Sequence, residues 1–358
     1  CGASKHDETM EVATHLAMQF WFQHDLQSPN WWNNDIGCPR TIGNAFLVLQ
    51  QSYGAASSPF LTPTELAGGL KMMKRAVWGT KWTGANLVDM AMITNARACI
   101  VNNATLASVS FAAIWSEIYI AHQEDDDIQL DASFHQHSGG GRGALVESYG
   151  AVFTSDVGKA VAMSAGTHFA PDAATVEIFA QHLLDGQRWM LTPSGTWDYS
   201  VMGRSNSGPS MLGVPEVWAD LALALPVQKN RSREVLDFAA LLRGEADAPS
   251  GPTGNKMFWC SDYMVHRTTA RTNVSMVATL RMYSNRTIAA RCVNMQGRHN
   301  QHSADGVLNL FFGDARGGNA AAHPLTGDAY YDITPVRDPR RLPGVTCETN
   351  ATLLACNS

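Results

Sequence analysis

The chain has 358 residues, of which 45% are hydrophobic and 16% charged, so it has the composition of a globular protein and the length for two domains. Its formal net charge of −6 argues against a general binder of nucleic acids or of anionic membranes. No apolar run approaches the roughly 20 residues that span a membrane. An acidic substrate remains compatible with this charge, because a local cluster of Arg, Asn and His can hold a carboxylate.

From residue 8 to about residue 243, the apolar spacing predicts successive amphipathic helices joined by Gly-, Pro- and Asn-rich connections. One of them starts at Thr62-Pro63-Thr64-Glu65, which supplies a cap and a first-turn proline. No fixed-length repeat accompanies the helices. The clearest helices are expected over residues 8–24, 62–78, 85–101, 103–122, 172–190 and 232–244.

The pattern changes after residues 244–255, which are rich in Pro, Gly and small residues and predict a linker. Residues 256–295 alternate apolar and polar side chains, and residues 303–314 read as a further strand, which predicts antiparallel β structure. Helices followed by strands indicate two segregated domains, 1–243 and 256–358. The second is short enough that we expect it to be incomplete.

Cysteines and glycosylation sequons point to secretion. The seven cysteines show no C-x-x-C spacing, which disfavours a zinc ribbon, and Cys260 with Cys292 and Cys347 with Cys356 are candidate disulfides. The chain begins at Cys1, so either a signal peptide has been removed or the sequence is a fragment. We expect a secreted glycoprotein. The five Asn-x-Ser/Thr sequons stand at Asn103, Asn230, Asn273, Asn285 and Asn350.

An aromatic patch precedes the second predicted helix. Trp31 and Trp32 stand among Asn30, Asn33 and Asn34. Tryptophan faces stack on sugar rings and Asn amides bond hydroxyl groups, so the patch is a candidate sugar-binding surface. A pair of tryptophans split between core and surface is the alternative.

Three further stretches carry polar side chains at helix ends or in a loop. Asn86 follows a glycine at a predicted helix start, close behind Trp82, where a helix cap would also explain it. The stretch "DASFHQHSGGGRGALVESYG" contains His137 and Tyr149, and it fits a surface loop, a zinc-binding His-x-His pair, or the acid and base of an enzyme. Arg204 follows a glycine between two helical segments.

Seven motifs in order give the chain a resemblance to polysaccharide lyase family 8, the hyaluronate, chondroitin AC and xanthan lyases. They are "NWW..IG.P", "W.TGAN..D", "D.SF.QH" with "SYG.VF", "WD..V.GR", "DY.VHR", "RM.SNRT" and "DI.PV.D...LPG.T", between Asn30 and Thr346. The resemblance implies an incomplete α/α toroid of paired helices followed by an antiparallel β-sandwich. Family members are considerably longer, so by this resemblance the chain is truncated.

The resemblance also implies a reaction, β-elimination at a uronic acid. Asn86 would donate hydrogen bonds to the uronate carboxylate, and Tyr149 would protonate the leaving O4. Arg204 would favour the Tyr149 phenolate, and His137 would share the proton transfer or bind the carboxylate. A route with Tyr149 alone and one with His137 as base both remain open. Asn30, Trp31, Trp32 and Trp82 would bind the polysaccharide.

Three departures from the family pattern stand out. The stretch between His137 and Tyr149 is a few residues longer, so it must bulge for both side chains to converge, and Arg142 is placed to enter the site. Gly208 replaces an arginine that often follows four residues after the one matching Arg204. Gln296 stands where a glutamate usually supports the catalytic residues.

Two rival functions are weighed against the lyase. A degenerate carbohydrate binder would keep the cleft without turnover. A metal-dependent hydrolase would use His135, His137 and the acidic run Glu124–Asp127, although a third ligand of fixed spacing is missing; a structural calcium at Asp125–Asp127 is the related alternative. We expect a monomeric enzyme acting on an acidic polysaccharide, with no metal, cofactor, nucleic acid or membrane partner.

Overall fold

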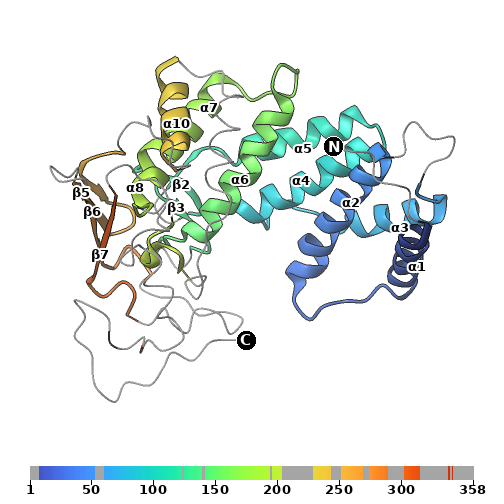
Figure 1. Cartoon of the computed structure of the whole chain (residues 1–358), viewed down its shortest axis with the longest axis horizontal. Helices are drawn as coiled ribbons and strands as arrows, with labels where there is room; N and C mark the ends of the chain where they lie inside the picture. Colours follow the sequence, from blue (N-terminus) through green and yellow to red (C-terminus); the bar gives the residue numbers. More distant parts are fainter. Residues whose placement is uncertain are drawn as a thin grey trace. The chain divides into compact units, whose positions relative to one another are not determined.

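Figure 1 shows the computed structural model of the chain. It describes residues 8–52, 60–122, 125–138, 142–193, 196–203, 229–242, 251–268, 274–288, 302–314, 338 and 341. The chain divides into two compact units, one made of residues 1–82 and 86–114, the other of residues 83–85 and 115–358. None of the described helices combines the length and apolar composition needed to cross a membrane.

The first unit is helical. Its elements are α1 (Glu8–His24), η1 (Asn33–Gly37), α2 (Cys38–Ser52), α3 (Pro63–Met73), most of α4 (Gly84–Ile100) and most of α5 (Ala104–Ser116). The expected start of α3 is confirmed: the Thr62 hydroxyl accepts from the Glu65 amide, and the Glu65 carboxylate accepts from the Thr62 amide. The core lies around Ile36, Phe46 and Met73, and Gly69 lacks the side chain that the Phe46 ring would otherwise meet.

The second unit begins with a small sheet. Strand β1 (Ile120–Ala121) runs parallel to β2 (Asp127–Gln129), which pairs antiparallel with β3 (Phe134–His135). The expectation of one helix over residues 103–122 is therefore wrong beyond Ser116. The Glu117 carboxylate accepts a hydrogen bond from the Gly84 N–H at the start of α4. The Ile-Tyr-Ile run that follows Glu117 has the high β propensity of a strand.

Helices of the second unit follow this sheet. Helix α6 (Glu147–Ser164) contacts β3, and α7 (Ala173–Gln181), η2 (His182–Gln187) and α8 (Arg188–Met190) form one continuous stretch over the expected range. The short η3 (Tyr199–Val201) and the helix α10 (Lys229–Leu242) come next.

The C-terminal part is an antiparallel sheet in the order β4-β5-β6-β7, made of β4 (Gly254–Phe258), β5 (Tyr263–Thr268), β6 (Val274–Arg281) and β7 (Val307–Asp314). The expected change from helices to antiparallel strands is confirmed, and Figure 1 shows the sheet beside α8. Its buried face mixes apolar side chains such as Tyr263 and Phe311 with the guanidinium groups of Arg267 and Arg281. The predicted boundaries 1–243, 244–255 and 256–358 stay a prediction.

The proposed disulfide of Cys260 is wrong. Cys260 is a free thiol in the turn between β4 and β5, where burial raises the pKa of its thiol to about 11. Its main-chain N–H donates to the Asp131 carboxylate at 2.6 Å, so the turn faces the helical part of the unit rather than another strand. Cys292, Cys347 and Cys356 lie outside the described residues.

Candidate active site

His137 and Tyr149 meet, although they are separated by the long glycine-rich stretch. Their rings pack edge to face with centroids 4.8 Å apart and an interplanar angle of 88°. Both residues are partly exposed. The structure thus brings together, within one unit, the two side chains expected to carry the acid–base chemistry.

His137 is aimed by the residues on either side of it. Its φ of 61° lies in the left-handed region, which His adopts more readily than most side chains. The Gln136 amide donates to Asp126 at 2.9 Å, and the same Asp126 accepts the Ser138 N–H at 2.7 Å. The Asp126 carboxylate therefore holds both chain neighbours of His137.

A buried carboxyl group lies in the first turn of α6, two residues before Tyr149. Glu147 accepts the Phe134 N–H and the Gln187 side-chain N–H, both at 3.2 Å. Burial raises the pKa of Glu147 to about 8, against hydrogen bonds that lower it, so the group holds a proton at neutral pH. Gly150 leaves room for it, because a Cβ there would stand 2.4 Å from a Glu147 carboxyl oxygen.

Asn86 is buried in the first turn of α4 and belongs to the other compact unit. The two main-chain N–H groups that precede it in the chain are fixed by side chains: Gly84 donates to Glu117 at 2.6 Å and Ala85 donates to Gln136 at 3.0 Å. Gln136 thus contacts both the start of α4 and Asp126. Gly84 adopts a φ of 56°, where a side chain would be strained.

Two of the acidic residues near this helix start have raised pKa values. Burial, followed by the charges of Glu117 and Asp126, raises the pKa of Asp127, and burial likewise raises the pKa of Glu117. Burial and the nearby carboxylates also raise the pKa of Tyr119. Within the described ranges, no group of three His, Cys, Asp or Glu side chains is arranged to hold a metal ion. His135, expected as a ligand in the hydrolase alternative, is fully buried against the Ser261 hydroxyl at 2.9 Å.

The aromatic patch lies in the first unit. Trp31 and Trp82 stack on each other with centroids 4.2 Å apart, and the Lys81 ammonium lies 4.5 Å from the Trp82 ring centroid. Trp31 and Trp32 are 37% and 38% exposed. The Asn30 side chain is used locally, since its oxygen accepts the Trp32 N–H at 3.1 Å. One face of Trp31 is therefore occupied by Trp82 while the tryptophan pair stays accessible.

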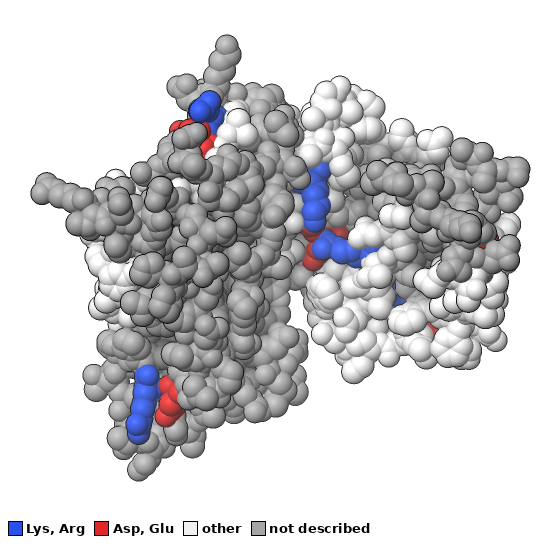
Figure 2. Space-filling model, in the orientation of Figure 1, with Lys and Arg blue, Asp and Glu red and all other residues white. Residues whose placement is uncertain are grey.

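Surface charges are mostly compensated on the face drawn in Figure 2, where most described atoms belong to uncharged residues and red atoms lie beside most of the blue ones. In the first unit, Arg40 pairs with the buried Asp89, and Arg75 pairs with Asp25. The Arg75 hydrogen bond accordingly lowers the pKa of Asp25. These arginines neutralise carboxylates of the chain itself.

Some expected residues cannot be placed. Arg204, Gly208 and Gln296 lie outside the described residues, and Arg142 is exposed directly after the undescribed residues 139–141. The segment leading to Arg204 is nevertheless fixed at Asp198, whose carboxylate accepts the Tyr263 hydroxyl at 2.7 Å.

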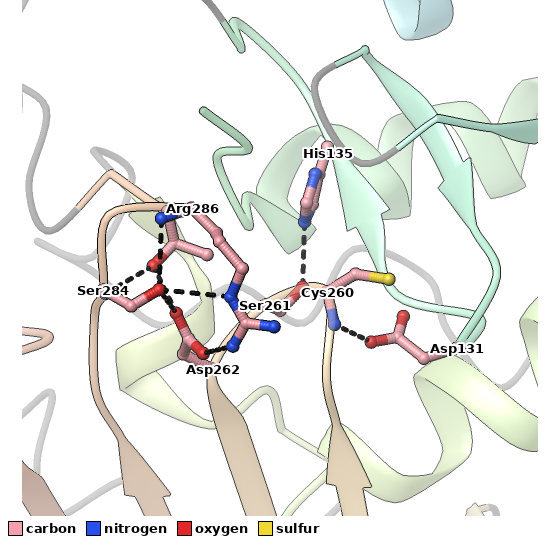
Figure 3. Close-up of polar contacts among 8 residues, drawn as sticks. Asp131, His135, Cys260, Ser261, Asp262, Ser284 and Arg286 are labelled. Atoms are coloured by element: carbon pink, nitrogen blue, oxygen red, sulfur yellow. Dashed lines mark hydrogen bonds and ion pairs between the residues drawn. The ribbon is translucent and has the colours of Figure 1, made fainter. Parts of the chain in front are cut away.

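The sequence alone indicated no role for several residues that bind the loop between His137 and Tyr149 or bind one another beside it. They belong to motifs that had been noticed only as points of resemblance: Asp262 is in "DY.VHR", and Ser284, Arg286 and Thr287 are in "RM.SNRT". Figure 3 shows Asp262, Ser284 and Arg286 converging. It also shows Ser261 directed towards His135 and the Cys260 main chain directed towards Asp131.

Known proteins similar to the chain are polysaccharide lyases. Chondroitinase-AC of Pedobacter heparinus is 27% identical over 336 residues, covering 92% of this chain and 43% of the relative. Hyaluronate lyase HylB of Enterococcus faecalis is 23% identical over 365 residues, covering 89% of this chain and 34% of the relative. The chain spans less than half the length of these relatives.

Solved structures show the same fold. A chondroitinase AC lyase solved with oligosaccharides gives a TM-score of 0.80 at 24% identity, covering 98% of this chain and 48% of that one. Paenibacillus xanthan lyase gives 0.73 at 16% identity, covering 100% and 35%. Residues 2–227 match the N terminal alpha-helical domain of polysaccharide lyase family 8, and residues 253–358 match its super-sandwich domain. The chain belongs to polysaccharide lyase family 8.

Proposed function

We propose that the protein cleaves a uronate-containing polysaccharide by β-elimination. The observation that carries the proposal is the packing of His137 against Tyr149, with ring centroids 4.8 Å apart and both residues partly exposed. Both similar relatives, Chondroitinase-AC and hyaluronate lyase HylB, are named as enzymes of this kind. A metal-dependent hydrolase is not favoured, because the buried His135 is engaged by Ser261.

In this reaction a base removes the proton on C5 of the uronate, the C5–H electron pair forms the C4–C5 double bond, and the C4–O4 bond breaks. The leaving O4 takes a proton from Tyr149. Asn86 is assigned to the uronate carboxylate, because the C5 proton becomes acidic only when the carboxylate accepts charge. Arg204 is assigned to the Tyr149 phenolate, which its positive charge would stabilise. The base is either the Tyr149 phenolate or His137, and the edge-to-face packing of the two rings is compatible with both routes.

Ultraviolet absorbance tests the proposal, because the new double bond is conjugated to the carboxylate and absorbs, whereas a hydrolysis product does not. The chain is incubated with hyaluronan, chondroitin, xanthan and a glucuronan. We expect a rising signal on at least one polymer and a loss of about 10²–10⁴-fold in Tyr149→Phe. Tyr283→Phe, which changes an exposed tyrosine elsewhere, should match wild type. A flat trace on all polymers by a folded protein that binds one of them would instead establish the degenerate carbohydrate binder.

The remaining assignments are part of the same proposal. Trp31, Trp32, Trp82 and Asn30 form a platform for the sugar chain, and Arg142 and Gln296 support the reacting groups. The polysaccharide is acidic, and the protein acts as a monomer without nucleic acid or membrane partners.

We further propose that the protein is a secreted glycoprotein. Two of its sequons are exposed at their asparagines, Asn103 at the start of α5 and Asn285 in the turn after β6. Expression in a glycosylating secretory host should give a mass that falls on treatment with an N-glycosidase. A mass equal to that of the bare chain would count against the proposal.

A further inference from the structure

The polar contacts in Figure 3 join two turns of the C-terminal sheet and connect them to Asp131 and His135, in the segment that leads to His137. Its centre is Asp262, which is 5% exposed and has a φ of 49°. One carboxylate oxygen accepts the Ser284 and Thr287 hydroxyls, each at 2.7 Å, and the other accepts the Arg286 guanidinium at 2.6 Å. One side chain therefore fixes the whole turn after β6.

This turn binds the loop directly. The Gly143 N–H donates to the Arg286 carbonyl, and the Ile288 N–H donates to the Gly143 carbonyl, both at 2.9 Å. Gly143 and Thr287 form a parallel bridge. Three residues later Val146 begins the first turn of α6, which carries Tyr149. The loop approaching Tyr149 is thus held at Gly143 by the turn that Asp262 organises.

The residues just before Asp262 bind the other arm of the loop. The Ser261 hydroxyl contacts His135 at 2.9 Å and the Ser133 hydroxyl at 2.7 Å, and the Cys260 N–H donates to Asp131 at 2.6 Å. These contacts fix the segment that leads to His137. The turn around Asp262 therefore touches both chain segments that deliver the paired rings.

We propose that Asp262 is a positioning residue for the elimination, which holds the turn 284–287 so that its main chain fixes Gly143 and, through it, the spacing of His137 and Tyr149. This rests on the proposed function. Burial would raise the pKa of Asp262, yet the hydroxyl hydrogen bonds and the Arg286 charge hold it below its ordinary value, so the carboxylate is ionised and accepts from all three donors at neutral pH. Displacement of reacting groups by about 1 Å costs on the order of 10²-fold in rate.

Asp262→Asn is the first variant, because Asn tolerates the left-handed backbone that Asp262 adopts and the change therefore reports on the hydrogen bonds. Two readouts are taken on the full chain: hydrogen exchange of the Gly143 amide, and kcat with KM from the absorbance assay. We expect roughly 10-fold faster exchange, a kcat reduced roughly 10- to 100-fold and a KM within about twofold of wild type. Asp305→Asn, which removes a carboxylate paired with His302 in the same domain, should change neither readout.

A second pair of variants keeps the test valid if Asp262→Asn fails to fold. Thr287→Val removes one donor to Asp262 while keeping the shape, and Thr287→Ser restores the hydroxyl. We expect Val to lower kcat and to speed Gly143 exchange, and Ser to restore both. Unchanged Gly143 exchange in Thr287→Val, or unchanged kcat with faster exchange, would overturn the inference. A wild-type chain that forms no double bond on any polymer would overturn the proposed function, while the exchange readout would still decide whether Asp262 holds the loop.

Discussion

Glu147 shows how a single buried side chain makes the region of Tyr149 sensitive to pH. Its carboxyl group is fully buried and its pKa is raised from an ordinary value of 4.5 to about 8. Between these two values the folded state keeps a proton that the unfolded state releases. The contribution of Glu147 to the free energy of unfolding is therefore complete below pH 4.5 and is lost as the pH rises towards 8.

We expect Glu147→Gln to remove this dependence. A glutamine fits, because the side-chain amide of Gln187 can rotate to exchange its oxygen and nitrogen. Its oxygen then accepts from the new amide, and its nitrogen donates to the Thr154 hydroxyl, which now donates to Gln187. Wild type should lose stability relative to the variant by about 1.4 kcal/mol for each pH unit between roughly pH 5.5 and 7, and by less as the pH approaches the folded pKa of about 8. Thermal unfolding at several pH values measures the slope, with the exposed Glu177→Gln as the control. A difference between wild type and variant that does not change with pH would contradict this explanation.

At the scale of elements, the π-helical turn η1 directly follows the pair Trp31 and Trp32. A Cβ on Gly37, the last residue of the turn Asn33–Gly37, would stand 2.8 Å from the Trp32 ring. The position of Trp32 beside this irregular turn therefore requires a glycine at the end of the turn. Such turns are frequent at functional sites.

Removal of one tryptophan should weaken substrate binding and leave the chemistry intact. We expect Trp31→Ala to raise the dissociation constant of the preferred polymer about 5- to 30-fold, because a sugar–aromatic contact and its support of Trp82 are lost. The kcat should change by less than about threefold. Trp259→Ala, which removes a 65% exposed tryptophan on the C-terminal sheet, is the matched control for affinity measurements. Equal affinities in both variants would remove Trp31 from the proposed platform.

Local patterns in the sequence predicted the elements better than their ends. The Thr62 cap and the alternation in β5 were readable because each depends on neighbours in the chain. The end of α5 at Ser116 was not, because Glu117 leaves the helix to bind the Gly84 amide, a partner far away in sequence. Tertiary contacts of this kind override helical periodicity.

At the scale of the whole molecule, the C-terminal sheet is attached through buried polar groups. Tyr263 donates to Asp198 at 2.7 Å, Asn309 donates to the same carboxylate at 3.2 Å, and Arg267 donates to the Leu191 carbonyl at 2.5 Å. Burial raises the pKa of Tyr263, so the hydroxyl keeps the proton that it donates. This interface depends on paired hydrogen bonds as well as on apolar area.

Loss of one of these donors should destabilise the fold. We expect Tyr263→Phe to lower the free energy of unfolding by about 1.5–3 kcal/mol, because a buried carboxylate loses a hydrogen bond. Denaturant unfolding measures the change. The same substitution at the exposed Tyr283 should cost less than about 0.5 kcal/mol.

The candidate site was predictable only in part for the same physical reason. His137 and Tyr149 were named because their motifs resemble a known family, and the structure places their rings together. Asp262 and Gln136 were not named, because their importance depends on which main-chain groups they meet, and those groups belong to distant segments. A motif states which side chain is present; the partner of that side chain is a property of the folded molecule.

The hydrogen bonds of Gly143 with Arg286 and Ile288 have a consequence for folding during synthesis of the chain. A ribosome makes the chain from its N-terminus, so His137 and Tyr149 emerge long before the segment that holds the loop between them. Until Ile288 has been synthesised, the nascent polypeptide lacks the main-chain groups that bind Gly143. The loop between His137 and Tyr149 can therefore reach its final structure only after the turn that follows β6 has left the ribosome.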